Sequence, residues 1–101
     1  MILSVDDSRL VELSAARFRA LGDPTRLRVI RELLDGTRCV CELRDRIGVS
    51  GPLLSHHLMV LRDAGLVAAS RRGRWIDYTL DRDALTDTFS AAIPEAAEAV
   101  R

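Results

Sequence analysis

The chain has 101 residues, of which 48% are hydrophobic and 30% charged, a composition that fits one small globular domain spanning residues 1–101. No stretch is long and apolar enough for a membrane span. The first ten residues also lack the basic and apolar regions of a secretory signal, so we expect a cytoplasmic protein with no membrane partner. Two cysteines cannot form a disulfide framework, and cytosolic thiols are normally reduced.

The formal net charge is zero, but the charges are unevenly distributed along the chain. Residues 50–75 hold four arginines and one acid, whereas residues 76–101 hold six acids and two arginines. Phosphate binding depends on local positive charge more than on the global sum, so the basic segment is a candidate nucleic-acid contact.

The spacing of apolar residues predicts two helices in the first third of the chain. The first spans about residues 8–21 and ends at Gly22. The second follows Asp23, a favourable N-cap, has Pro24 at its first position and runs to about Leu34. In the first helix, Leu10, Leu13, Arg17 and Leu21 are spaced along one face; in the second, the apolar residues that follow the helical period are Leu27, Ile30, Leu33 and Leu34.

Two further helices follow, separated by a short turn that contains glycine. The third spans about residues 40–47 and is closed by Gly48; the fourth is capped by Ser50 and stops at Gly65. Such a pair fits a helix-turn-helix, in which the second helix enters the major groove of DNA. The residues of the fourth helix predicted to point inward are Leu54, Leu58, Leu61 and Leu66.

Two short strands, residues 66–70 and 75–80, are predicted next, with a hairpin turn at residues 71–74. A last helix starts at Asp81, with Leu85, Phe89, Ile93 and Val100 as its apolar residues, and Pro94 should kink or break it. The expected fold class is therefore mainly α with a small β-hairpin, in the order α-α-α-α-β-β-α. A basic hairpin directly after a helix-turn-helix forms a wing, so we predict a winged helix-turn-helix.

Several motifs, in order from about residue 16 to residue 80, carry a family resemblance. They are Asp23-Pro24-Thr25-Arg26, Cys39-Val40-Cys41-Glu42-Leu43, Ser55-His56-His57-Leu58, Leu61-Arg62, Ala64-Gly65-Leu66-Val67, Gly73-Arg74 and Tyr78. In this order and spacing they resemble the ArsR/SmtB family of metal-responsive repressors. The resemblance covers nearly the whole chain and implies a dimeric repressor that binds double-stranded operator DNA.

The predicted DNA contacts come from the fourth helix and the wing. Ser55 and His56 resemble the family's DNA-contacting pair, whereas His57 points about 100° away from His56 on a helix and is predicted to pack. Trp75 and Tyr78 are expected to pack on the strands rather than stack on bases. The full set of predicted DNA-binding residues is Ser50, Gly51, Leu53, Ser55, His56, Arg62, Arg71, Arg72 and Arg74.

Cys39 and Cys41 are the predicted metal ligands. On a regular helix they would point about 200° apart, but at a frayed helix start they can converge. There the helix dipole and Arg38 are expected to lower the pKa of the thiols. In the family that the chain resembles, this position binds thiophilic ions: arsenite, antimonite, cadmium, lead and sometimes zinc. The alternative is a pair of buried structural thiols.

The chain departs from the family's sensors in its remaining ligands. Arg44 stands where arsenic sensors carry a third cysteine, and two thiolates alone cannot complete a metal site. A small thiol, water, or a carboxylate such as Glu42 or Asp45 would have to supply the rest. We predict As(III) or Sb(III) as the inducer because a soft three-coordinate ion needs the fewest ligands; Cd, Pb and Zn are the alternatives.

The family's second metal site, on the last helix, needs histidines, and this chain has none after His57. The acids in that region are predicted to cap and solvate the helix, so the second site is expected to be absent. These acids are Asp81, Asp83, Glu95 and Glu98.

The first and last helices resemble the family's dimer interface. A two-fold dimer would place two recognition helices one DNA turn apart, roughly 34 Å, which matches an inverted-repeat operator. The apolar and small residues predicted for this interface are Leu10, Leu13, Leu21, Phe89, Ala92, Ile93 and Ala96.

These features predict a homodimer that represses transcription in the apo form. Ion binding would move the third helix and release the DNA. Oxidation or reactive sulfur is an alternative signal for the same fold, although a disulfide across one intervening residue is expected to be strained. An enzyme is not expected, because no acid or other third residue lies at a recognisable catalytic spacing from the Cys and His residues, and no glycine-rich phosphate-binding loop is present. A third interpretation is a winged-helix module that binds another protein instead of DNA, but the arginine-rich wing argues against it.

Overall fold

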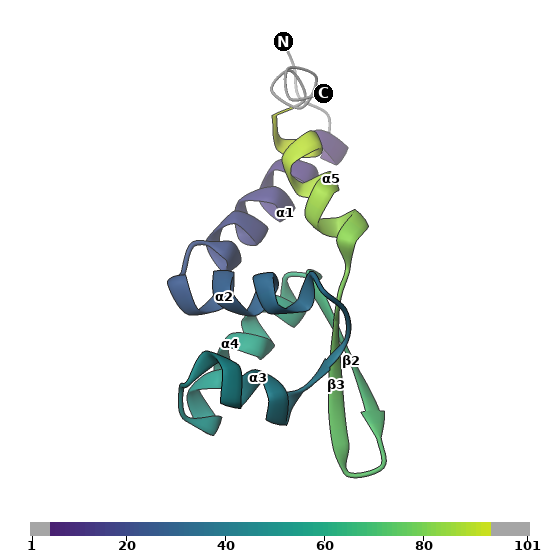
Figure 1. Cartoon of the computed structure of the whole chain (residues 1–101). Helices are drawn as coiled ribbons and strands as arrows, with labels where there is room; N and C mark the ends of the chain where they lie inside the picture. Colours follow the sequence, from purple (N-terminus) through teal and green to yellow (C-terminus); the bar gives the residue numbers. More distant parts are fainter. Residues whose placement is uncertain (1–4, 94–101) are drawn as a thin grey trace.

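The computed structural model describes residues 5–93, which form five helices and one small sheet (Figure 1). The elements are α1 (Val5–Leu21), α2 (Pro24–Leu33), β1 (Arg38–Cys39), α3 (Val40–Ile47), α4 (Gly51–Asp63), β2 (Val67–Arg72), β3 (Trp75–Leu80) and α5 (Arg82–Ala92). The predicted winged helix-turn-helix is confirmed, and β1 is an addition to it. No helix among the described residues is long and apolar enough to cross a membrane.

The helix boundaries follow from local capping chemistry. The side chains of Asp23, Ser50 and Asp81 each accept a backbone N–H three residues further on, and these residues begin α2, α4 and α5. Gly48 ends α3 in the left-handed conformation, with φ of 77°. The predicted caps are therefore confirmed, while α1 begins earlier than the predicted residue 8.

The hairpin is longer and its turn tighter than predicted. Strand β2 continues to Arg72, which pairs with Trp75, so the turn contains Gly73 and Arg74 instead of four residues. Gly73 has φ of 61°, and a glycine at the first turn position suits a two-residue hairpin because it adopts positive φ without a Cβ clash. Figure 1 shows the hairpin projecting away from the helices.

Strand β1 makes the sheet three-stranded, in the order β1-β3-β2, with antiparallel pairing throughout. Arg38 pairs with Tyr78 and Cys39 with Asp77. The chain thus enters α3 directly from an edge of the wing sheet. Two residues are too few to show an alternating pattern, which is why the sequence did not predict this strand.

The core lies between α2, α3, α4 and the start of the hairpin. The four residues predicted to point inward from the fourth helix, together with Leu43 of α3, are all essentially inaccessible. Leu27 and Leu34, which follow the helical period with Ile30 and Leu33, are 47% and 41% exposed, because the residues that α2 buries in the core are Val29, Ile30 and Leu33.

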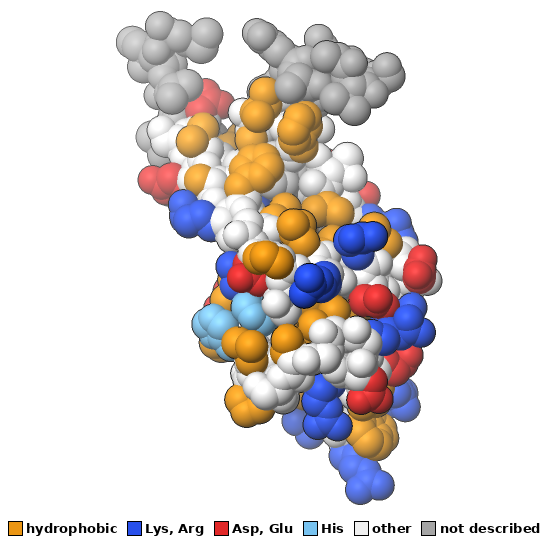
Figure 2. Space-filling model, turned by 60° about the vertical axis from the view of Figure 1, so that its left-hand side comes forward, with side chains coloured by type: hydrophobic (Ala, Val, Ile, Leu, Met, Phe, Trp, Pro, Cys, Tyr) orange, Lys and Arg blue, Asp and Glu red, His pale blue; other side chains and the backbone are white. Residues whose placement is uncertain are grey.

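Helices α1 and α5 pack against each other at the end of the molecule opposite the hairpin tip (Figure 1). Much of their apolar surface is exposed, and Figure 2 shows hydrophobic side chains gathered there, whereas arginines crowd the opposite tip. The large exposed apolar residues on these two helices are Leu10, Val11, Leu13, Phe18 and Phe89, and Ile93 at the C-cap of α5 is exposed as well. Pro94, Glu95, Ala96, Glu98 and Val100, which entered the predictions above, lie outside the described residues.

Candidate nucleic-acid interface and thiol pair

Helix α4 separates its two histidines onto different faces. His56 is exposed, whereas His57 is 7% exposed and its Nδ1 lies 3.1 Å from a guanidinium nitrogen of Arg26. Arg26 also donates to the Ala20 carbonyl, and Asp23 lies 3.8 Å from the same ring nitrogen. The burial of His57 confirms the prediction that this residue packs. The network around it also holds the start of α2 against the inner face of α4.

Asp23 is the acid of this network. The Arg26 backbone N–H, which donates to the carboxylate, is the main reason that the pKa of Asp23 lies below its ordinary value, and the nearby His57 and Arg26 side chains act in the same direction. An ionised Asp23 therefore serves both as the α2 cap and as a fixed negative charge beside His57.

The other predicted contact residues of α4 lie on its solvent side. Leu53, Ser55 and Arg62 are exposed, and Gly51 is half-buried. Ser50 is exposed too, but its hydroxyl accepts the Leu53 N–H as the helix cap. The exposed face of α4 is thus free to meet a DNA groove, with Ser50 fixed at its start.

The wing arginines differ in what they contact. Arg71 lines a depression with Arg62 of α4, so α4 and the wing present neighbouring positive charges. The Arg74 guanidinium lies 5.7 Å from the centre of the Trp75 ring. Trp75 is 44% exposed, so the expectation that strand packing covers it is only partly met, whereas Tyr78 packs against the core.

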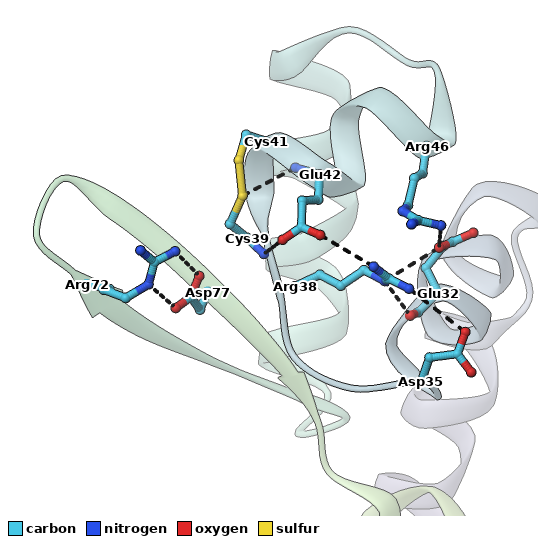
Figure 3. Close-up of polar contacts among 9 residues, drawn as sticks. All are labelled: Glu32, Asp35, Arg38, Cys39, Cys41, Glu42, Arg46, Arg72 and Asp77. Atoms are coloured by element: carbon cyan, nitrogen blue, oxygen red, sulfur yellow. Dashed lines mark hydrogen bonds and ion pairs between the residues drawn. A yellow bond between two sulfur atoms is a disulfide. The ribbon is translucent and has the colours of Figure 1, made fainter.

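Arg72 is held by an acid of the neighbouring strand. Its guanidinium donates to both Asp77 oxygens, at 2.8 and 3.2 Å (Figure 3). These hydrogen bonds hold the pKa of the Asp77 carboxyl below its usual range and raise that of Arg72. This pair was not predicted from the sequence, because only the strand register brings the two side chains together.

Cys39 and Cys41 converge at the start of α3, as predicted. Cys39 is the N-cap, with an extended backbone (φ −74°, ψ 157°), and only Cys41 is helical; their Cα atoms are 5.3 Å apart. The two sulfurs are joined in a disulfide (Figure 3). The expectation of reduced thiols is therefore not met in this structure. The extended cap residue turns the first sulfur toward the second, which a continuous helix would not do.

Arg38 is not directed at the sulfurs (Figure 3), contrary to the placement that the sequence suggested. Its guanidinium points away from the sulfurs and lies 3.4 to 3.9 Å from carboxylate oxygens of Glu32, Asp35 and Glu42 (Figure 3). The sulfur of Cys39 instead accepts the backbone N–H of Glu42 at 3.3 Å, while the Glu42 carboxylate accepts the Cys39 N–H. This reciprocal capping box places Cys39 Sγ at the positive end of α3.

The described part of the chain gathers no group of three or more His, Cys, Asp or Glu side chains that could hold a metal ion. Glu42 is engaged by Arg38 and by the Cys39 backbone, which directs its carboxylate away from the sulfurs. Glu42 thus does not complete a metal site in this structure.

Comparison with known proteins places these features in a family. Residues 23–69 match the family described as "Bacterial regulatory protein, arsR family". An uncharacterised HTH-type transcriptional regulator of Methanocaldococcus jannaschii is 41% identical over 71% of this chain and 82% of its own length. The arsenical resistance operon repressor of Bacillus subtilis is 34% identical over 82% of this chain and 80% of its own length.

The chain spans 65 to 66% of the length of some other curated relatives. Among solved structures, an ArsR-like transcriptional regulator from Rhodococcus has a TM-score of 0.76, with 31% identity over 89% of this chain and 85% of that one. The matched relatives are named as transcriptional regulators and not as enzymes.

Proposed function

The chain belongs to the arsR family of bacterial regulatory proteins, and from this premise we propose that it is a transcriptional repressor whose hold on operator DNA is controlled at Cys39 and Cys41. Exposed residues of α4 would read base edges in the major groove, and the wing arginines would contact phosphates. The proposed DNA-binding set is Ser50, Gly51, Leu53, Ser55, His56, Arg62, Arg71, Arg72 and Arg74.

The observation that carries the proposal is the link between the thiol pair and the wing. Cys39 stands opposite Asp77 in the sheet, and the Asp77 carboxylate holds Arg72. A chemical change at the sulfurs would alter the backbone of β1, and β3 would pass this change to the wing. Coupling of this kind is typically worth about 1–3 kcal/mol, a 5- to 150-fold change in affinity.

We propose As(III) or Sb(III) as the inducer of the reduced pair, with Cd, Pb or Zn as the other soft or borderline ions to test. A relative named for arsenical resistance supports this choice. Two thiolates need a further donor, which in this proposal comes from outside the chain, as a small thiol or water.

Homodimerisation is part of the proposal. Helices α1 and α5 expose several large apolar side chains at the same end of the molecule, and a second copy would cover them. A two-fold axis at this end would leave both wings and both α4 helices facing DNA.

Oxidation is the second candidate signal, favoured by the Cys39–Cys41 disulfide itself. In this alternative the reduced chain binds DNA and the disulfide form does not, or the reverse. Mild peroxide, applied with arsenite absent, separates this signal from ion binding.

The test is fluorescence anisotropy of a labelled inverted-repeat DNA from the gene's upstream region, with a scrambled duplex as control. Reduced protein should bind the native sequence more tightly, and affinity should fall steeply with salt because phosphate contacts release counterions. Arsenite, antimonite, cadmium, lead and zinc are then added separately, and sedimentation gives the oligomeric state. Equal affinity for both duplexes would contradict sequence-specific repression, and release by no soft ion would remove the proposed inducers.

A further inference from the structure

A depression of about 220 Å³ lies where the starts of α3 and α4 meet the hairpin. Its lining includes Cys41 and Arg44 of α3, Gly51 and Ser55 of α4, and Trp75 of β3. Drug-sized ligands usually need roughly 300–1,000 Å³, so this space suits a smaller molecule. We propose that it binds a low-molecular-weight thiol bearing a carboxylate, and that this thiol exchanges with the disulfide at Cys41.

The two sulfurs of the disulfide differ in access and in electrostatic surroundings. Cys39 is 6% exposed, and its Sγ accepts the Glu42 N–H at the start of α3. Cys41 is half-buried and lines the depression. A thiolate seated there meets Cys41, and the charge that develops on the departing Cys39 sulfur is stabilised by the Glu42 N–H and the helix dipole.

The exchange is balanced without any added oxidant. The sulfur of the small thiolate attacks Sγ of Cys41, and a new S–S bond forms between them. The Cys39–Cys41 bond breaks, and its electron pair stays on Cys39 as a thiolate. The product is a mixed disulfide at Cys41 beside a free Cys39 thiolate. A second small thiolate can then attack the sulfur of the bound small thiol, which forms a small-molecule disulfide and releases Cys41 as a thiolate, so that both cysteines are reduced.

Arg44 supplies the selectivity for a carboxylate. It is exposed, it lines the depression beside Cys41, and its side chain makes no ion pair within the described part of the chain. Arg46 lies on the same helix but contacts Glu32 at 3.3 Å and borders a different depression. The two arginines therefore form a matched pair for testing, with equal charge and different surroundings.

The regulatory meaning of this site rests on the proposed function. The depression shares Gly51 and Ser55 with the proposed DNA-binding set, so an adduct at Cys41 would occupy space beside the start of α4. It would also lie against Trp75, the sole tryptophan of the chain, whose fluorescence then reports occupancy.

The experiment uses the full chain in its disulfide form, with intact mass confirming the bond. Matched 3-mercaptopropionate and 2-mercaptoethanol are added, and the exchange is followed by Trp75 fluorescence. Samples are quenched with acid and alkylated. Cleavage by trypsin after Arg38 and Arg44 releases one peptide that contains both cysteines, and its fragmentation locates the adduct and the alkyl group.

We expect the adduct on Cys41 and the alkyl group on Cys39. The rate ratio of mercaptopropionate to mercaptoethanol should fall roughly two- to five-fold in Arg44→Gln, the size of an exposed ion pair, and stay unchanged in Arg46→Gln. An adduct on Cys39, equal adducts on both cysteines, or equal ratios in the two variants would overturn the site. Failure of the chain to form the disulfide under mild oxidation would overturn it as well.

Operator binding by the adduct-bearing protein separates the site from the function. If the adduct forms at Cys41 with the expected selectivity and operator affinity is unchanged, the site stands and control through the thiol pair is refuted. If selectivity fails while operator affinity still responds to the state of the thiols, the proposed function stands and the binding site is refuted.

Discussion

Helices α3 and α4 each begin with a side chain that accepts a backbone N–H three residues later, but the accepting atom is sulfur in α3 and oxygen in α4. At α3, the Cys39 sulfur accepts the Glu42 N–H at 3.3 Å; at α4, the Ser50 hydroxyl accepts the Leu53 N–H at 3.3 Å. The sulfur is also bonded to Cys41, whereas the hydroxyl is chemically inert. The helix proposed to read DNA thus has a permanent cap, and the helix before it has a cap whose covalent state can change.

The two caps also differ in what they connect. Around Cys39, the capping box continues through Glu42 to Arg38 and on to Glu32 of α2. Among residues 5–93, the Ser50 hydroxyl bonds only to the Leu53 N–H of its own helix. A change at the α3 cap is therefore positioned to reach both α2 and, through β1, the wing.

The largest effects are expected at the two histidines of α4, where one substitution should weaken operator binding and the other should lower stability. His56→Ala should weaken specific operator binding about 5- to 150-fold, the equivalent of one good base contact, without lowering thermal stability. His57→Ala should lower the free energy of unfolding by about 1–3 kcal/mol, because Arg26 loses a buried acceptor. Fluorescence anisotropy measures the operator affinity of the two variants, and thermal unfolding measures their stability. Loss of stability in His56→Ala with normal DNA binding would reverse the assignment.

The next effect concerns the caps themselves. Ser50→Ala should destabilise the protein by about 1 kcal/mol, since no side chain then accepts the Leu53 N–H. In reduced protein, Cys39→Ser should cost less than Cys39→Ala, because a hydroxyl can still cap α3. Chemical denaturation of the three variants ranks them. If Cys39→Ser and Cys39→Ala are equally destabilised, the sulfur is not acting as a cap.

A smaller effect is expected in the wing. Arg71→Gln should reduce the slope of log affinity against log salt by about 1, as expected for one lost phosphate contact. Arg72→Gln should change the slope less, because Asp77 already holds that guanidinium. Salt titrations of operator binding compare the two variants. A larger change in Arg72→Gln would show that Arg72 leaves Asp77 to contact DNA.

The smallest effect is the pH dependence of the Arg72–Asp77 pair. The pKa of Asp77 is lower in the folded protein than its ordinary value, so the pair stabilises the fold at neutral pH, and this contribution is lost as pH falls below about 4. Asp77→Asn should therefore destabilise slightly at neutral pH and not at low pH. Asp87→Asn, an exposed acid of α5, is the control. The same loss at both pH values would contradict an ionic role for Asp77.

The sequence predicted the elements that carry their own local signals. Asp23, Ser50 and Asp81 mark helix starts because their side chains cap the backbone directly, and the leucines of α4 point inward because their spacing matches the helical period. The convergence of the two cysteines was also predictable, since a helix start permits an extended residue at the cap.

The features that the sequence missed depend on contacts between distant residues. Strand β1 exists only through its pairing with β3, and the Arg72–Asp77 pair depends on the register of the hairpin. Arg38 was misassigned because its closeness in sequence to the cysteines says nothing of direction; three carboxylates attract its guanidinium elsewhere. Helical spacing alone likewise could not tell that Leu27 faces solvent.

The most direct measurement is operator affinity in three states of one sample: reduced, reduced with arsenite, and oxidised. It is made on the wild type and on Cys39→Ser/Cys41→Ser, which keeps a hydroxyl at the cap and removes the sulfur chemistry. We expect at least one change of state to shift wild-type affinity 5- to 150-fold, and the double variant to bind with the same affinity in all three states. An equal shift in both proteins, or none in the wild type, would contradict control at the thiol pair.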